Sequence, residues 1–295
     1  MKNPKGQVIF SLLLLFLSLP GLKAAEEAGR IEVRSWIDWI DGTFILETSY
    51  FPSGVERPSP GLRQHAMMEI SRNLPLLFLN EISHVQVDSR NTLGDLMDES
   101  AELTRILLEI GDRGNIDRAA FNADFSCFTQ MRHYRLYPDL IDLLMNPYGA
   151  SAQTAELQYI PSGNYSGIVI DADGLLPVYG TSKTARLQPA LFPNIYNADM
   201  ELLFEKHMVD PVQLRIRGMV QYVPADEIER IHSRVGETPL FVHATKLHGI
   251  QSTDLIVSDR SGRRLRADEN MLSLLREGKI VVLHSAEQSS ASDHR

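Results

Sequence analysis

The feature that most constrains this chain is the shortness of its apolar runs. The longest predominantly apolar run spans twelve residues, 8–19, whereas a helix that crosses a membrane needs about 20. Elsewhere, apolar residues recur at the spacings of amphipathic helices and short strands. With 295 residues and 43% hydrophobic content, the chain can bury a sizeable core. It must therefore fold by packing helices and strands around that core.

The amino-terminal run has the flanks of an export signal. Two lysines precede it, a Pro-Gly pair follows it, and Ala24 and Ala25 offer small residues at a cleavage point. This pattern predicts a cleavable signal peptide over residues 1–24 and a periplasmic mature protein without a membrane span. The alternative, an uncleaved anchor, is disfavoured by the length of the run. No cysteine lies directly after the cleavage point, so no lipid anchor is expected.

Charge argues against nucleic acid as a partner. The net charge of the chain is −9, and loss of the leader with its three lysines leaves 26 basic against 38 acidic residues, or −12. A surface this acidic repels phosphate backbones and anionic lipid headgroups. Four arginines cluster near the carboxyl end, and we interpret them as a solvated turn between two strands rather than a binding patch. They are Arg260, Arg263, Arg264 and Arg266.

The order of the predicted elements indicates an α+β fold, with helices packed on mixed or antiparallel sheets and a strand-rich carboxyl-terminal half. Strands are expected at 31–51 with a turn or bulge at Gly42, and at 82–87, 119–137, 165–172, 201–205, 214–223, 240–247, 255–258 and 279–284. Helices are expected at 62–79, where Pro75 could kink the helix, and at 92–110, 140–145, 225–234 and 267–277. The Pro-, Gly- and Ser-rich stretch 146–163 separates an amino-terminal region, 25–148, from a carboxyl-terminal region, 163–285, and 286–295 is expected to be a flexible tail.

One segment resembles a catalytic motif. The apolar strand 168–170 ends in Asp171-Ala172-Asp173-Gly174, which is similar to the way haloacid-dehalogenase-type phosphatases present a nucleophilic carboxylate and a second acid. Such chemistry needs a magnesium ion and a further acid after a later strand. Asp254 and Asp259 are the later candidates, but Asp254 precedes its strand. The other interpretation is a turn that ends the strand, because Asp and Gly favour such geometry.

The remaining candidate groups favour structural roles. His243 and His248 are five residues apart on one predicted strand, so they should point to opposite faces and could share a metal ion only across a bend. Cys127, the only cysteine, is interpreted as a small core residue. Trp36, Trp39, Tyr50 and Phe51 could form an aromatic ligand platform, but core or interface packing is preferred. No cofactor and no metal site is predicted.

Three blocks in a fixed order carry a family resemblance. They are 73–96, 165–204 and 236–282, within a region of similarity that spans about residues 57–285. They resemble a group of bacterial envelope proteins best represented in spirochaetes, related in its core to LPP20-type lipoproteins and to the periplasmic flagellar assembly protein T. The family's usual Asp-Ala-Arg-Gly is Asp171-Ala172-Asp173-Gly174 in this chain. The second acid, Asp173, is therefore interpreted as a substitution within a turn.

The resemblance implies a non-catalytic accessory protein of the periplasm or envelope that acts through protein–protein contacts and has no cofactor. Family members linked to flagella make the flagellar apparatus one candidate partner. The rival hypothesis is a magnesium-dependent phosphatase that uses Asp171 and Asp173. A third class, a ligand-binding module, requires a concave pocket, which a sequence does not reveal.

Overall fold

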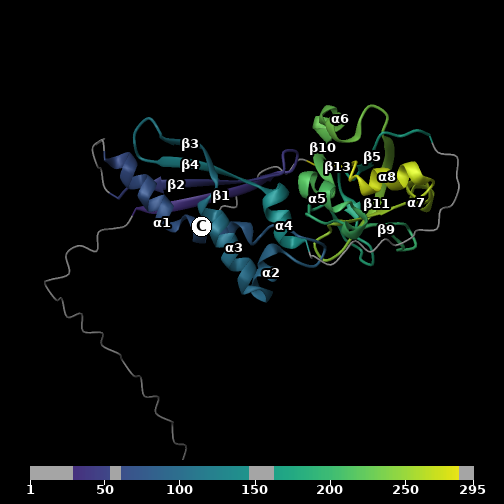
Figure 1. Ribbon diagram of the computed structural model, residues 1–295, viewed down its shortest axis with the longest axis horizontal. Coiled ribbons are helices and arrows are strands. Elements are labelled where there is room, and N and C mark those ends of the chain that lie inside the picture. The colour runs from purple at the N-terminus through teal and green to yellow at the C-terminus, as the bar shows by residue number, and fades with distance from the viewer. Residues whose placement is uncertain (1–28, 54–60, 146–162, 286–295) are drawn as a thin grey trace, which may run out of the picture.

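The computed structural model describes residues 29–53, 61–145 and 163–285, which form two α+β domains (Figure 1). The predicted fold class is therefore confirmed. The predicted signal peptide and tail, and nearly all of the predicted junction, lie outside the described residues. Among the described helices, none combines the length and the apolar character that crossing a membrane requires.

The first domain is built on a four-stranded antiparallel sheet in the order β1-β2-β4-β3. Its strands are β1 (Arg30–Asp38), β2 (Thr43–Phe51), β3 (Asn115–Phe121) and β4 (Phe128–Arg135). The predicted turn at Gly42 joins β1 to β2, with a backbone φ of +62° that glycine tolerates. β1 lies at one edge of the sheet, with β2 as its partner along its whole length.

Helix α1 (Leu62–Ile82) packs against this sheet (Figure 1). Its buried stripe includes Leu74, Phe78 and Ile82, and it continues through Pro75. The prediction of a strand over 82–87 was wrong, because the helix runs on to Ile82 and a turn follows it. Apolar residues at the end of a helix and in the next turn can imitate the alternation of a strand.

The expected helix 92–110 is two helices, α2 (Leu93–Glu99) and α3 (Ala101–Asp112). Thr92 caps α2 in a reciprocal capping box with Asp95. The chain then bends at Ser100, whose extended backbone ends one helix and whose hydroxyl caps the next.

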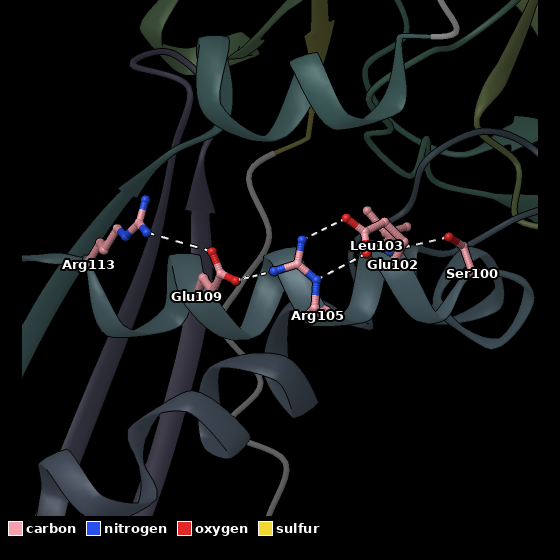
Figure 2. A network of polar contacts seen from close by, with 6 residues as sticks. All are labelled: Ser100, Glu102, Leu103, Arg105, Glu109 and Arg113. Atoms are coloured by element: carbon pink, nitrogen blue, oxygen red, sulfur yellow. Dashed lines mark hydrogen bonds and ion pairs between the residues drawn. The ribbon is translucent and has the colours of Figure 1, made fainter.

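The exposed face of α3 carries a chain of ion pairs (Figure 2). Arg105 bonds Glu102 at 2.7 Å and also pairs with Glu109, which in turn lies 3.7 Å from Arg113. All four side chains are well exposed, so this network stabilises the helix only modestly and marks a solvated surface.

The second domain holds a seven-stranded mixed sheet in the order β10-β13-β5-β11-β12-β8-β9. Its strands are β5 (Ile168–Asp171), β8 (Ile195–Tyr196), β9 (Leu202–Phe204), β10 (Gln221–Pro224), β11 (Leu240–His248), β12 (Asp254–Val257) and β13 (Ile280–His284). The four strands from β10 to β11 are parallel, and β12 is antiparallel to β11. A small two-stranded sheet, β6 (Leu176–Pro177) and β7 (Thr184–Ala185), follows β5 in the chain.

Three further predictions are corrected, two in the second domain and one, Cys127, beside β4 of the first. The expected strand 214–223 is helix α5 (Pro211–Arg217) followed by β10, because Asp210 caps the helix and proline occupies its first turn. The arginine cluster is not a turn between strands but helix α7 (Asp259–Leu265), capped by Ser258. Cys127 is only partly buried, so it is not a core residue.

The other short helices lie between these elements. They are η1 (Leu136–Leu140), α4 (Ile141–Leu144), η2 (Lys206–Met208), η3 (Ala225–Ile231), α6 (His232–Val235) and α8 (Glu269–Arg276). The expected helices 140–145, 225–234 and 267–277 are represented by α4, by η3 with α6, and by α8.

Candidate functional site

The two acids of the predicted phosphatase motif form part of a turn after β5. An oxygen of Asp171 accepts the amide hydrogen of Asp173 at 3.1 Å. An oxygen of Asp173 accepts the amide of Gly174 at 2.8 Å and the hydroxyl of Ser285 at 2.7 Å. Gly174 has a φ of +84°. These bonds have the geometry of a self-capped chain reversal.

No third acid joins them. Asp171 lies beside His243 in the sheet register, and the two side chains are 3.1 Å apart. Asp254 instead lies opposite His248 in the register of β12 against β11, and Asp259 accepts the amide of Ala198. Within the three described stretches, no cluster of three or more His, Cys, Asp or Glu side chains is placed to hold a metal ion.

The strand that carries both histidines is bulged. The register of β11 against β12 shifts between Ala244 and Lys246. Because the bulge resets the alternation, His243 and His248 both lie on the less buried side, away from Val242 and Leu247. The predicted placement on opposite faces was therefore wrong, although the two histidines still stand at different places along the strand.

The two domains are hydrogen-bonded to each other. The amides of Leu191 and Phe192 donate to the carbonyls of Gln86 and Val87 at 3.0 and 2.8 Å. The side chain of Gln221 donates to the carbonyl of Ile40, at the tip of the β1–β2 hairpin. In Figure 1 this hairpin reaches toward the second domain. An ion pair between Arg215 and Asp142 joins α5 to α4.

Aromatic rings complete this interface. Trp39 meets the ring of Tyr222 edge-on at 5.2 Å, as the preference for interface packing predicted. The ring of Tyr137 lies against both Gly42 and Gly218, so closely that a Cβ atom on either glycine would lie within 2.4 Å of it. Burial raises the pKa of Tyr137 to about 12. The interface is thus a packed junction between the domains.

A groove of about 480 Å³ follows the end of β1 along this junction. We call it the β1 groove, and it is lined by residues 35–40 together with Phe44, Glu81, His84, Val85, Gln86, Gln188, Pro189, Tyr222, Pro224, Glu227, Arg230 and His284. Trp36 is 42% exposed there, a large apolar surface left open to solvent.

A second cavity of about 640 Å³, the interdomain pocket, lies between the loop 88–90 of the first domain and several loops of the second. Its remaining lining residues are Val178, Tyr179, Thr181, Phe192, Asn194, Tyr196, Glu205, Lys206, His207, His248, Gly249, Ile250 and Asp254. The His248 ring stands edge-on to Tyr179 at 5.8 Å and to Tyr196 at 5.6 Å.

Asp254 lies in the floor of the interdomain pocket and is only 1% exposed. One of its oxygens accepts the amide of Asn194 at 2.9 Å, whereas its buried Oδ2 atom has no hydrogen-bond partner of ordinary geometry among the residues that the structure describes. Burial raises the pKa of this carboxyl, although the nearby groups of Asn194, Ser89 and His248 lower it in part. A buried polar atom without a partner requires an explanation.

Comparison with protein families agrees with this two-domain division. Residues 30–143 match the model of the N-terminal domain of Treponema pallidum Tp0624, and residues 167–286 match the model of its second domain. Both matched regions are thus similar to Tp0624 domains. Their order along this chain follows that of Tp0624, and they contain the four-stranded and the seven-stranded sheet respectively. The predicted resemblance to a spirochaete family is confirmed at this level. A search of curated proteins found no match.

The sequence predicted neither the β1 groove nor the interdomain pocket. Asp254 offered one signal, since it is an acid placed directly before an apolar strand. Arg90 and Lys206, which lie in the pocket wall, fall in connecting segments without periodicity. Their convergence depends on how the domains pack together.

Proposed function

We propose that this chain is a non-catalytic accessory protein of the bacterial envelope that acts through protein–protein contacts. The proposal includes export by the predicted leader and a partner that docks in the β1 groove. The flagellar apparatus is one candidate source of that partner, through the predicted kinship with LPP20-type lipoproteins and the flagellar assembly protein T. The observation that carries the proposal is the exposed Trp36 in a groove along a sheet edge.

A sheet edge favours an extended peptide as the docked group. β1 pairs with β2 alone among the described strands, so its outer edge offers unpaired backbone groups. An extended segment can add to such an edge by main-chain hydrogen bonds, with side-chain pockets giving specificity. Tryptophan is among the residues that most often dominate binding energy at protein interfaces. Trp36 is therefore the expected anchor.

Charge in the β1 groove indicates which segment would fit. Its lining includes the acids Asp38, Glu81 and Glu227 and one permanently charged base, Arg230, which pairs with Glu227 at 2.8 Å. A segment with basic side chains next to an aromatic or aliphatic anchor complements this lining.

The phosphatase alternative has no comparable support. Asp171 and Asp173 accept hydrogen bonds from the amides of their own turn, and Asp171 is also paired with His243. A nucleophilic role would require these oxygens to face a substrate and a magnesium ion.

Site-specific photocrosslinking in the native cell tests the proposal. A photoreactive amino acid replaces Trp36 in one strain and Met68, which is 54% exposed on α1, in a control strain. We expect a discrete adduct with one protein from position 36 and none from position 68. Absence of an adduct at position 36, or the same adducts at both positions, would contradict a partner in the β1 groove.

A further inference from the structure

We infer that the interdomain pocket binds a small zwitterionic ligand, of the class of free amino acids and short peptides. This inference stands apart from the docking of a protein partner, since it rests on another cavity. It depends on three features of the pocket: its size and aromatic walls, two cations without carboxylate partners, and a buried carboxylate beneath its floor.

The size and walls of the pocket suit a small organic molecule. Its volume of about 640 Å³ lies within the range of small-molecule sites, which are frequent between domains. The rings of Tyr179, Tyr196 and Phe192 offer apolar surface, and Thr181 and Asn194 offer polar groups that can fix orientation. A ligand of this size would contact both domains at once.

Two side chains can hold an anionic group. Arg90 comes from the first domain and Lys206 from the second, and both line the pocket. Neither forms an ion pair with any residue that the structure describes, although Lys206 lies over the ring of Phe192 at 5.0 Å. A carboxylate on the ligand would give both cations a charged hydrogen-bond partner.

Asp254 provides the opposite charge. Its carboxylate lies under the floor, and one oxygen has no hydrogen-bond partner within the described part of the chain. In a poorly screened interior, a positive group above the floor interacts favourably with this charge even without direct contact. Asp88 is less suited to this role, since it accepts the amides of Arg90 and Asn91 in its own loop. A ligand that places an ammonium group over Asp254 and a carboxylate near Arg90 carries both charges and is therefore a zwitterion.

Calorimetric titration of the mature chain provides the test. The probes are the twenty free L-amino acids and the dipeptide alanyl-phenylalanine, each also in N-acetylated and C-amidated form. We expect at least one uncapped probe to bind with a Kd below about 1 mM. Acetylation, which removes the ammonium charge, and amidation, which removes the carboxylate, should each weaken that binding about tenfold.

Variants of the chain link the binding to this pocket. Arg90→Gln, Lys206→Gln and Asp254→Asn should each weaken binding about tenfold. The control Arg118→Gln removes an exposed cation on β3, outside the pocket, and should leave the affinity unchanged. The inference is overturned if no probe binds below that limit, if capping has no effect, or if the pocket variants bind as the control does. Crosslinking at position 36 tests the protein partner of the β1 groove in a separate experiment. Failure of one proposal is therefore distinguishable from failure of the other.

Discussion

Replacement of Arg234 by methionine should destabilise the second domain strongly. The guanidinium is buried and donates to the carbonyls of Gly278, Arg217 and Gly218 at 2.7, 2.6 and 2.9 Å. Burial lowers its pKa to about 10, so it remains charged at neutral pH. Each charged hydrogen bond contributes about 1.5–3 kcal/mol, and the cost of burying the charge offsets part of that sum. We expect a net loss of about 3 kcal/mol in the free energy of unfolding.

Urea unfolding followed by circular dichroism measures this loss, and Arg230→Met provides a matched control. Arg230 lies four residues earlier, but its side chain is 43% exposed and pairs with Glu227 on the surface. Such pairs contribute about 1 kcal/mol or less. If Arg234→Met lowers the free energy of unfolding no more than Arg230→Met does, the three hydrogen bonds from the Arg234 guanidinium to carbonyls do not stabilise the domain as argued, and the prediction is refuted.

Three further predictions concern the domain interface, the pocket floor and the leader. Gly218→Ala should cost about 3 kcal/mol in urea unfolding, because the new Cβ meets the ring of Tyr137 at a positive φ. Gly174→Ala, at a similar φ with open space around it, should cost less. If the two variants lose equal amounts of unfolding free energy, contact with the Tyr137 ring is not the cause of the loss at Gly218. The raised pKa of Asp254 means that the folded state binds the proton of this carboxyl more tightly than the unfolded state does. The protonated carboxyl therefore stabilises the folded state fully below its ordinary pKa of 3.8. This stabilisation is lost as the pH rises through the raised pKa of the folded state. Asp254→Asn should therefore stabilise the chain at pH 7 and not below pH 3.8, and a benefit independent of pH in thermal unfolding would contradict this. The mature protein isolated from cells should begin near Ala25 by amino-terminal sequencing, and retention of residues 1–24 would contradict cleavage.

The sequence predicted the centre of the fold better than its boundaries. The central parallel strands β5 and β13 are short apolar runs, which can only be buried strands when glycine and polar residues flank them. Predictions failed where one apolar pattern fits two structures. The stretch 214–223 is apolar at intervals that suit either a strand or a helix, and the cap at Asp210 decided for α5.

The turn after β5 could be interpreted from the sequence because its chemistry is local. The carboxylates of Asp171 and Asp173 accept hydrogen bonds from backbone amides one or two residues further along the chain. The interdomain pocket is the opposite case, since its walls come from segments between residues 88 and 254 that no periodicity connects. Only the packing of one domain on the other brings Arg90 near Lys206.

The same reasoning explains why a buried charge can persist at Asp254. A carboxylate in the floor of a cavity lowers the stability of the folded chain, and an amide or an apolar residue would fill the place at less cost. Folded proteins keep such unfavourable groups mainly where a function requires them. Asp254 is the first residue of β12, directly under a pocket whose two cations form no ion pair with any described residue. Its charge is therefore better explained by a ligand above the floor than by the stability of β12.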